Sequence, residues 1–170
     1  IIVDGFDQKQ ICKLIATEEL GWLLLMPGMV GALAAELKAQ RIKTRGVKVC
    51  GVMADLVPPR EIAEITGLLN APYANTFGAT ETGCPPCSSN LLPIGIIPDS
   101  LSKQQSPFCE IKLVDAEGRE VEDGLPGELC MRGPTLFSGY WLDPEVNKKE
   151  FRDGWFHMGD VFSRNPDGSL

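Results

Sequence analysis

The sequence contains one histidine, two tyrosines and no long apolar segment in its 170 residues. Because His157 stands alone, any imidazole base or metal ligand would depend on that one residue, and we interpret it as structural. A transmembrane helix needs about 18 consecutive apolar residues, and no segment approaches this length. The amino terminus also lacks the basic and then apolar pattern of a secretory signal. These absences favour a cytoplasmic protein.

Positive charge is too sparse for a surface that binds nucleic acid or membranes. The chain has 16 Lys and Arg residues against 23 Asp and Glu, a net charge of -7, whereas such binding depends on clustered Lys and Arg. The basic residues between Lys38 and Lys48 are dispersed, which is typical of a solvated rim. Hydrophobic residues make up 44% of the chain, enough for a packed core. We therefore expect small-molecule partners, not nucleic acid or a membrane.

Six cysteines are spread along the chain, and two of them frame the segment Cys84-Pro85-Pro86-Cys87. A structural zinc site needs four ligands, and the sequence has neither a second Cys-x-x-Cys pair nor a histidine pair. A thioredoxin-like motif should open a helix, which two prolines do not favour. We expect reduced thiols in a loop, and a small redox protein remains an alternative.

Residues 1–105 predict alternating helices and strands. Asp7 is expected to cap a first helix, a second follows residue 29, and Pro58-Pro59 opens a third. Each helix carries apolar residues at helical spacing. Strands are predicted at residues 1–3, 22–26, 47–52 and 73–77. This alternation indicates an α/β fold with a parallel sheet, flanking helices and ligands at the carboxyl ends of the strands.

Residues 106–170 show a different pattern. After a loop rich in Ser, Asn and Pro at residues 88–106, the apolar residues Cys109, Ile111 and Leu113 alternate with polar ones, which predicts a strand with one wet face. Turn residues at 115–118 and a further strand at 128–132 follow. We therefore predict a smaller antiparallel, β-rich and barrel-like subdomain.

Three motifs define a family resemblance. They are the run Asn75–Gly83, the run Gly127–Pro134 that continues through Gly139-Tyr140-Trp141, and the run Asp153–Asp160. In this order and spacing they resemble the adenylate-forming (AMP-binding) superfamily, and Ala79 indicates its acyl-CoA ligase branch. The resemblance implies an internal fragment of the large N-terminal domain, with residues 1–105 ending its α/β subdomain and 106–170 preceding the hinge.

The resemblance gives particular residues a role in binding ATP. Thr80 matches the hydroxyl that contacts phosphate, and Glu81 matches the carboxylate that holds Mg²⁺; neither is itself a catalytic base. Asp160 matches the aspartate that accepts hydrogen bonds from both ribose hydroxyls, for which a carboxylate offers two acceptor oxygens. Without the later motifs, all three would be read as turn-capping side chains. The other residues expected around the nucleotide are Ala54, Asn75, Thr76, Phe77 and Gly78.

Some positions depart from the family pattern. Phe77 stands where tyrosine usually stacks on adenine, and a core aromatic is an equal interpretation. Met158 replaces a threonine, and Val52-Met53 replaces a small pair that usually contains glycine. A degenerate, non-catalytic domain used for interaction therefore stays open as an alternative. The residues expected to line an acyl pocket are Met29, Met53, Ala79, Gly83 and Cys84.

The family joins a carboxylic acid to AMP from Mg·ATP and then transfers the acyl group to the thiol of CoA. The expected cofactors are thus ATP or AMP, Mg²⁺ and CoA, and the expected partners are a small carboxylic acid and the rest of the parent enzyme. The family's phosphate loop and its carboxylate-activating lysine have no counterpart in these 170 residues, so we expect the isolated chain to be inactive. The sequence does not indicate which acid is used.

Overall fold

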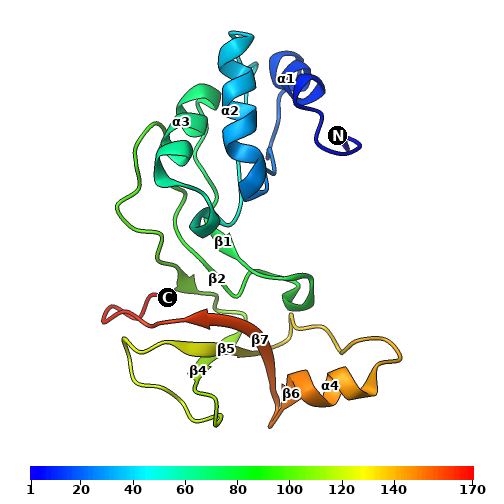
Figure 1. Ribbon diagram of the computed structural model, residues 1–170, viewed down its shortest axis with the longest axis vertical. Coiled ribbons are helices and arrows are strands. Elements are labelled where there is room, and N and C mark those ends of the chain that lie inside the picture. The colour runs from blue at the N-terminus through cyan, green and yellow to red at the C-terminus, as the bar shows by residue number, and fades with distance from the viewer. The chain divides into compact units, whose positions relative to one another are not determined.

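The computed structural model describes all 170 residues and divides into two compact units (Figure 1). Unit 1 comprises residues 1–76 and 89–101, and unit 2 comprises residues 77–88 and 102–170. The units interleave along the chain, and each is described by itself. The division predicted between residues 105 and 106 stays a prediction about the longer protein.

Unit 1 contains the three predicted helices. They are α1 (Gln8–Thr17), α2 (Val30–Ala39) and α3 (Pro59–Leu69). The Asp7 carboxylate caps α1 by accepting hydrogen bonds from the backbone N–H groups of Lys9 and Gln10. Proline opens α3, and Asn70 ends it in the left-handed conformation with φ 50°. These helix predictions are confirmed, since strong local signals mark the ends of each segment.

The helices of unit 1 enclose one apolar core. In Figure 1, α2 lies between α1 and α3 and packs against both. Their buried faces carry the periodic residues expected from the sequence, and bury them almost completely. The core of unit 1 includes Ile11, Ile15, Val30, Leu33, Leu37, Ile62, Ile65, Leu69 and Tyr73.

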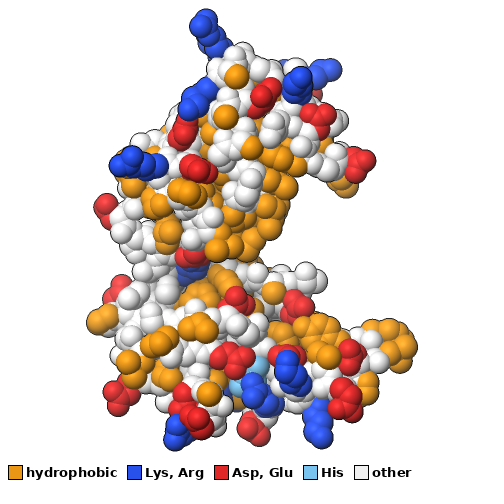
Figure 2. All heavy atoms as spheres, viewed as in Figure 1, with side chains coloured by type: hydrophobic (Ala, Val, Ile, Leu, Met, Phe, Trp, Pro, Cys, Tyr) orange, Lys and Arg blue, Asp and Glu red, His pale blue; other side chains and the backbone are white.

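The predicted parallel sheet is wrong. The segments expected to form it make only single parallel bridges, which pair Leu20 with Val47, Leu23 with Cys50, and Cys50 with Tyr73. Residues 1–3 form no strand. A parallel sheet would bury the run 22–26 on both faces, but Trp22 and Leu24 are more than half exposed. Figure 2 also shows a broad patch of hydrophobic side chains on the visible face of unit 1.

The regular strands of the structure lie in two other sheets. A small sheet has the order β1-β2-β3, formed by Thr76–Phe77, Cys87–Ser88 and Gln104–Gln105, and its β2 and β3 pair antiparallel. The larger sheet of unit 2 has the order β4-β5-β7-β6 and is antiparallel throughout. Its strands are β4 (Glu110–Val114), β5 (Gly127–Arg132), β6 (Phe151–Arg152) and β7 (Trp155–Phe162). The antiparallel pairing expected in this region is therefore present.

Four shorter helices complete the chain. Three are single 3-10 turns, η1 (Pro27–Met29), η2 (Ala54–Leu56) and η3 (Thr80–Thr82). The fourth is α4 (Pro144–Glu150), which sequence reasoning did not predict. Because α4 has no buried residue, it lacks apolar periodicity, and only its N-cap Asp143 and first residue Pro144 mark it. No helix in the structure is both long enough and apolar enough to span a bilayer.

A bulge between β5 and β7 shapes the site of unit 2. Glu128 pairs with Val161 and Cys130 pairs with His157, so three residues of β7 oppose the single residue Leu129. These three are Met158, Gly159 and Asp160. Gly159 has φ 79°, a left-handed conformation that suits glycine. Such bulges redirect side chains and are frequent beside binding sites.

Candidate functional site

A cavity of about 490 Å³ lies within unit 2. Its wall combines acidic, basic and aromatic side chains from η3, α4 and the strands of the large sheet. The lining residues are Ala79, Glu81, Glu128, Tyr140, Lys149, Glu150, Arg152, Phe156, His157, Met158 and Gly159. Of the predicted site residues, Ala79 and Glu81 line this cavity, while Thr80 and Asp160 each adjoin a lining residue. The cavity is therefore the natural centre of the candidate site.

Glu81 is a positioned carboxylate in this wall. Its side chain is half-buried, and Tyr140 Oη donates a hydrogen bond to Glu81 Oε1 at 3.1 Å. The backbone carbonyl of Glu81 accepts a second bond from Phe137 N–H at 2.8 Å. Burial, then the hydrogen bond and charge of Glu81, raise the pKa of Tyr140, which keeps its phenol protonated as a donor. Two contacts from one distant segment thus fix this residue.

A tight turn sets Thr80 beside Glu81. Thr82 Oγ1 donates to the carbonyl of Ala79 at 2.8 Å, which closes the turn around η3. Gly83 then has φ 67°, and a Cβ there would lie 2.4 Å from the carbonyl oxygen of Thr135. Only glycine fits this close approach. Thr80 is exposed, so its hydroxyl is free to meet a ligand.

Phe77 packs as a core aromatic in this structure. Its ring lies 4.7 Å from that of Phe162 in an edge-to-face arrangement. Both rings pack on an apolar cluster that also includes Met158. Gly78 follows in close contact with Thr82, whose Oγ1 would lie 3.2 Å from an added Cβ. The stacking of Phe77 on adenine stays a prediction.

Asp160 belongs to the bulge of β7. The residue is exposed, yet nearby protein atoms partly desolvate the carboxyl and raise its pKa. Its neighbour Gly159 lines the cavity and donates its backbone N–H to Glu128 Oε1 at 3.2 Å. Asp160 therefore follows directly on a lining residue whose backbone N–H is held by Glu128.

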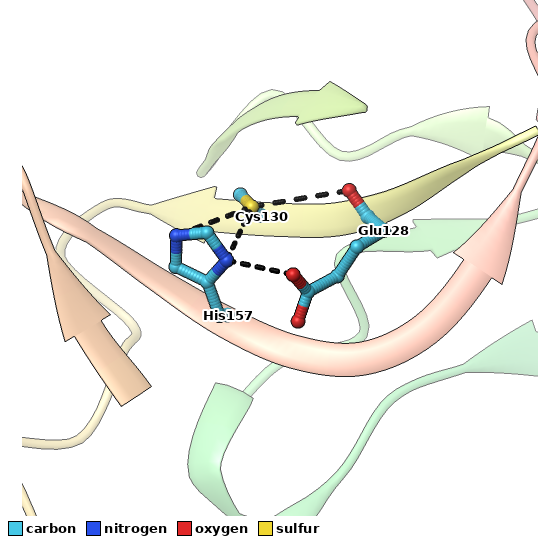
Figure 3. Close-up of side chains that lie close together, drawn as sticks. All are labelled: Glu128, Cys130 and His157. Atoms are coloured by element: carbon cyan, nitrogen blue, oxygen red, sulfur yellow. Dashed lines mark hydrogen bonds and ion pairs between the residues drawn. The ribbon is translucent and has the colours of Figure 1, made fainter. Parts of the chain in front are cut away.

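Glu128 and His157 of this wall form a cluster with the buried Cys130. Figure 3 shows Glu128 and Cys130 on β5 next to the ring of His157 on β7. His157 Nδ1 lies 2.8 Å from Glu128 Oε2 and 3.2 Å from Cys130 Sγ. Arg152 Nη2 lies 2.5 Å from the same nitrogen and 3.4 Å from Glu128 Oε2. The cluster thus joins a carboxylate, a thiol, an imidazole and a guanidinium.

The surroundings of this cluster shift two pKa values. Burial alone would raise the pKa of Glu128, but the hydrogen bond and charge of His157, the N–H of Gly159 and the charge of Arg152 lower it overall. Burial, assisted by the charge of Glu128, raises the pKa of the Cys130 thiol to about 11. Glu128 is therefore charged and Cys130 protonated at neutral pH.

The remaining predicted residues belong to unit 1. Ala54 is fully buried, and Met53 before it has the left-handed φ of 48°. Asn75 is buried, and its Nδ2 donates to the carbonyl of Leu101 at 2.8 Å, while its Oδ1 has no hydrogen-bond donor. Thr76, in β1, is half-buried. Met29 lines a mainly apolar cavity of about 420 Å³ with Trp22, Leu24 and Met26.

The predicted acyl-pocket residues fall into both units. Met29 and Met53 lie in unit 1, and Ala79, Gly83 and Cys84 lie in unit 2. Cys84 is exposed and Cys87 is buried at the start of β2, and neither opens a helix. None of the six cysteines forms a disulfide. The acyl pocket stays a prediction.

Sequence reasoning missed two features of the site. It named Tyr140 within a motif but did not pair it with Glu81, 59 residues away. It also gave Cys130 no role in the site and interpreted His157 as structural. A signal for the cluster existed, because Glu128 and Cys130 are two residues apart and share one face of a strand. The partner strand and its bulge could not be read from that spacing.

Comparison with known proteins identifies the class. The AMP-binding enzyme family matches residues 1–141, and the chain belongs to this family. Among curated relatives, the medium/long-chain-fatty-acid–CoA ligase FadD8 of Mycobacterium tuberculosis is 27% identical over 99% of this chain, and indoleacetate–CoA ligase of Aromatoleum aromaticum is 26% identical over 97%. This chain spans 29% and 32% of their respective lengths, about a third.

Solved structures share the fold. A candidate long-chain-fatty-acid CoA ligase from Rhodopseudomonas palustris aligns with a TM-score of 0.76 and 28% identity, over 97% of this chain and 40% of that one. The anthranilate CoA ligase AuaEII, solved with anthranoyl-AMP, aligns with a TM-score of 0.80 and 22% identity, over 95% of this chain and 31% of that one. The relatives thus include ligases of both fatty and aromatic acids.

Proposed function

We propose that this chain supplies part of the nucleotide site of an AMP-forming acyl-CoA ligase. The observation that carries the proposal is the half-buried carboxylate of Glu81, which Tyr140 holds in the wall of the unit 2 cavity. A charged side chain loses hydration when it is partly buried, so its placement needs a compensating partner. Tyr140 is one such partner, and a bound cation would be a second.

The residues present fit a magnesium ion. Mg²⁺ prefers oxygen ligands and is commonly held by one or two carboxylates together with substrate phosphates. Tyr140 occupies Oε1 of Glu81, and Oε2 remains for such an ion. When bound, the ion would neutralise charge on the phosphates of ATP. Thr80, exposed beside Glu81, would donate its hydroxyl to a phosphate oxygen.

Two further residues would bind the nucleoside. Asp160, exposed on the bulge of β7, would accept hydrogen bonds from the two ribose hydroxyls. Asn75 Oδ1 is a buried acceptor without a donor, and leaving such an atom unsatisfied costs about 1–3 kcal/mol. On the family resemblance, Asn75 would lie at the edge of adenine. We assign Ala54, Thr76, Phe77 and Gly78 to the surroundings of the base on the family resemblance alone.

The acid and CoA would be bound largely by residues outside this chain, which spans about a third of its curated relatives. Met29, Met53, Ala79, Gly83 and Cys84 would contribute to the acyl pocket. The substrate class is a carboxylic acid, because the relatives named above activate fatty or aromatic acids.

A non-catalytic domain is the second candidate. Met53 favours it, because a large side chain with a left-handed φ stands in the pair where the family usually has glycine. Met158, packed in the apolar cluster with Phe77, replaces the usual threonine. Calorimetry of the full-length protein with Mg·ATP separates the two candidates, since the degenerate domain would show no binding heat.

The substitution Glu81→Gln tests the proposal in the full-length protein. Glutamine keeps an oxygen that accepts the Tyr140 hydrogen bond but removes the charge, so the melting temperature should change little. Loss of a preorganised electrostatic contact should lower acid-dependent ATP–pyrophosphate exchange by roughly a hundredfold or more. The exposed Glu122→Gln is the matched control. Equal exchange rates in the two variants would remove Glu81 from the nucleotide site.

A further inference from the structure

The cluster of Glu128, Cys130 and His157 carries an inference that goes beyond the proposed ligase function. One carboxylate oxygen, one sulfur and one ring nitrogen lie within 4.8 Å of one another. They come from two paired strands, β5 and β7, in which Cys130 lies directly opposite His157. Cys130 and His157 are buried and Glu128 is half-buried. Rigid strands of the large sheet thus hold all three groups in place.

We propose that Glu128 Oε2, Cys130 Sγ and His157 Nδ1 form a binding site for a zinc ion. Sulfur, imidazole nitrogen and carboxylate oxygen are the ligands that Zn²⁺ takes in proteins. Bonds of about 2.0–2.3 Å in a tetrahedral site place ligand atoms roughly 3.3–3.6 Å apart. The observed separations from Nδ1 are slightly shorter, at 2.8 Å and 3.2 Å, and all three ligand atoms lie within 4.8 Å of one another. Small side-chain movements would therefore complete the site.

The hydrogen bonding of His157 supports this site. Nδ1 faces a carboxylate oxygen, which accepts, and the Nη2 group of Arg152, which donates. If Nδ1 carries a proton, it repels the guanidinium, and if it does not, it repels the carboxylate. No single tautomer satisfies both neighbours. A cation bound by Nδ1, Oε2 and Sγ resolves this conflict, because all three groups then offer it a lone pair.

In the absence of zinc, the guanidinium of Arg152 supplies the positive charge next to Glu128 and His157. Its guanidinium contacts both His157 and Glu128, but its side chain is 50% exposed and lies on the two-residue strand β6. It can therefore turn outward into solvent when a metal ion takes its place. The Cys130 thiol loses its proton on binding, so one proton is released for each zinc ion bound.

The site has three protein ligands and one open position. Glu128 and His157 both line the unit 2 cavity, so a water molecule from the cavity supplies the fourth ligand. A structural zinc site has four protein ligands, and the Cys84–Cys87 segment lacks the further ligands for one. The site proposed here has three protein ligands and uses neither of these cysteines. Cys84 takes no part in it and provides a matched control.

Cobalt titration of the reduced, chelator-treated protein tests the proposal. Co²⁺ replaces Zn²⁺ and gives a near-ultraviolet charge-transfer band only when a thiolate binds it. We expect a band that saturates at one equivalent and disappears on adding Zn²⁺. Cys84→Ser should keep the band, and Cys130→Ser should lose it. Absence of the band, or its loss in Cys84→Ser with retention in Cys130→Ser, overturns the site.

Two further variants test the site even if Cys130→Ser fails to fold. Glu128→Gln keeps the thiol and the shape of the side chain but removes a charged ligand, so cobalt affinity should fall at least about tenfold. Arg152→Gln removes the competing cation, so affinity should rise. Unchanged affinity in both variants means that the three side chains form only a hydrogen-bonded cluster around Arg152, and the proposal fails.

Discussion

At Met53, replacement by glycine should destabilise the protein less than replacement by alanine, the reverse of the usual order. Met53 has φ 48° and ψ 61°, the left-handed conformation, which costs a non-glycine residue roughly 1–2 kcal/mol. Glycine avoids this cost, although its flexibility in the unfolded chain costs about 0.5–1 kcal/mol relative to alanine. Met53→Gly should therefore be more stable than Met53→Ala by roughly 0.5–1 kcal/mol. Both variants lose the same side chain beyond Cβ, so packing cancels in the comparison.

Urea unfolding followed by tryptophan fluorescence measures this difference. Trp22 reports on the region, since its indole N–H donates to the carbonyl of Gly51 at 3.0 Å. With a slope of about 2 kcal/mol per molar urea, the two midpoints should differ by roughly 0.3–0.5 M.

The exposed helical residue Lys13 provides the control with the opposite sign. In the interior of α1, Lys13→Gly should be less stable than Lys13→Ala by about 1 kcal/mol. If the alanine variant is the more stable one at both positions, Met53 is not strained, and backbone conformation does not explain why the family usually has glycine in this pair.

Three other predictions follow from exposure, charge and chain length. One of the six cysteines, Cys84, should react promptly with Ellman's reagent at pH 8, because the others are buried and burial raises the pKa of Cys50 to about 12; prompt reaction of Cys84→Ser would contradict this. Folding lowers the pKa of Glu128 below its ordinary value of 4.5, so its stabilisation is present above that pH and is lost as the pH falls through the folded pKa. The melting temperatures of the protein and Glu128→Gln should therefore converge between pH 6 and roughly pH 3, and a constant gap would contradict it. The 170 residues alone should show no ATP–pyrophosphate exchange with any acid, since most barrier reduction depends on groups that they lack; detectable exchange would refute it.

Local signals made the helices of unit 1 predictable. Asp7, Pro58-Pro59 and the apolar spacing of α1–α3 lie within each segment and need no distant partner. Strand pairing is different, because the apolar run 22–26 does not determine how many of its residues will form backbone hydrogen bonds with the neighbouring segment. An apolar run also does not show whether the protein buries both of its faces. Both missing facts led to the wrong parallel sheet.

In the candidate site too, the residues within local motifs could be predicted, but their contacts with distant residues could not. Glu81 and Asp160 can be singled out from the sequence because each lies in a contiguous motif. The contact of Tyr140 with Glu81 joins residues 59 positions apart, and no local pattern contains it. The cluster around His157 depends on the bulge opposite Leu129, which changes the register between β5 and β7. Tertiary register, which single-sequence patterns leave open, therefore determined what was missed.

The most direct test of the nucleotide site is Asp160→Ala in the full-length protein. Hydrogen bonds to a charged acceptor contribute about 1.5–3 kcal/mol each, so losing one or two should lower kcat/KM for ATP by roughly one to four powers of ten. The melting temperature should hardly change, because Asp160 is exposed and supports no core. The exposed Asp99→Ala should change neither quantity. If Asp160→Ala instead melts much earlier while keeping its ATP kinetics, Asp160 is a structural residue of the bulge and the proposed nucleotide site is wrong.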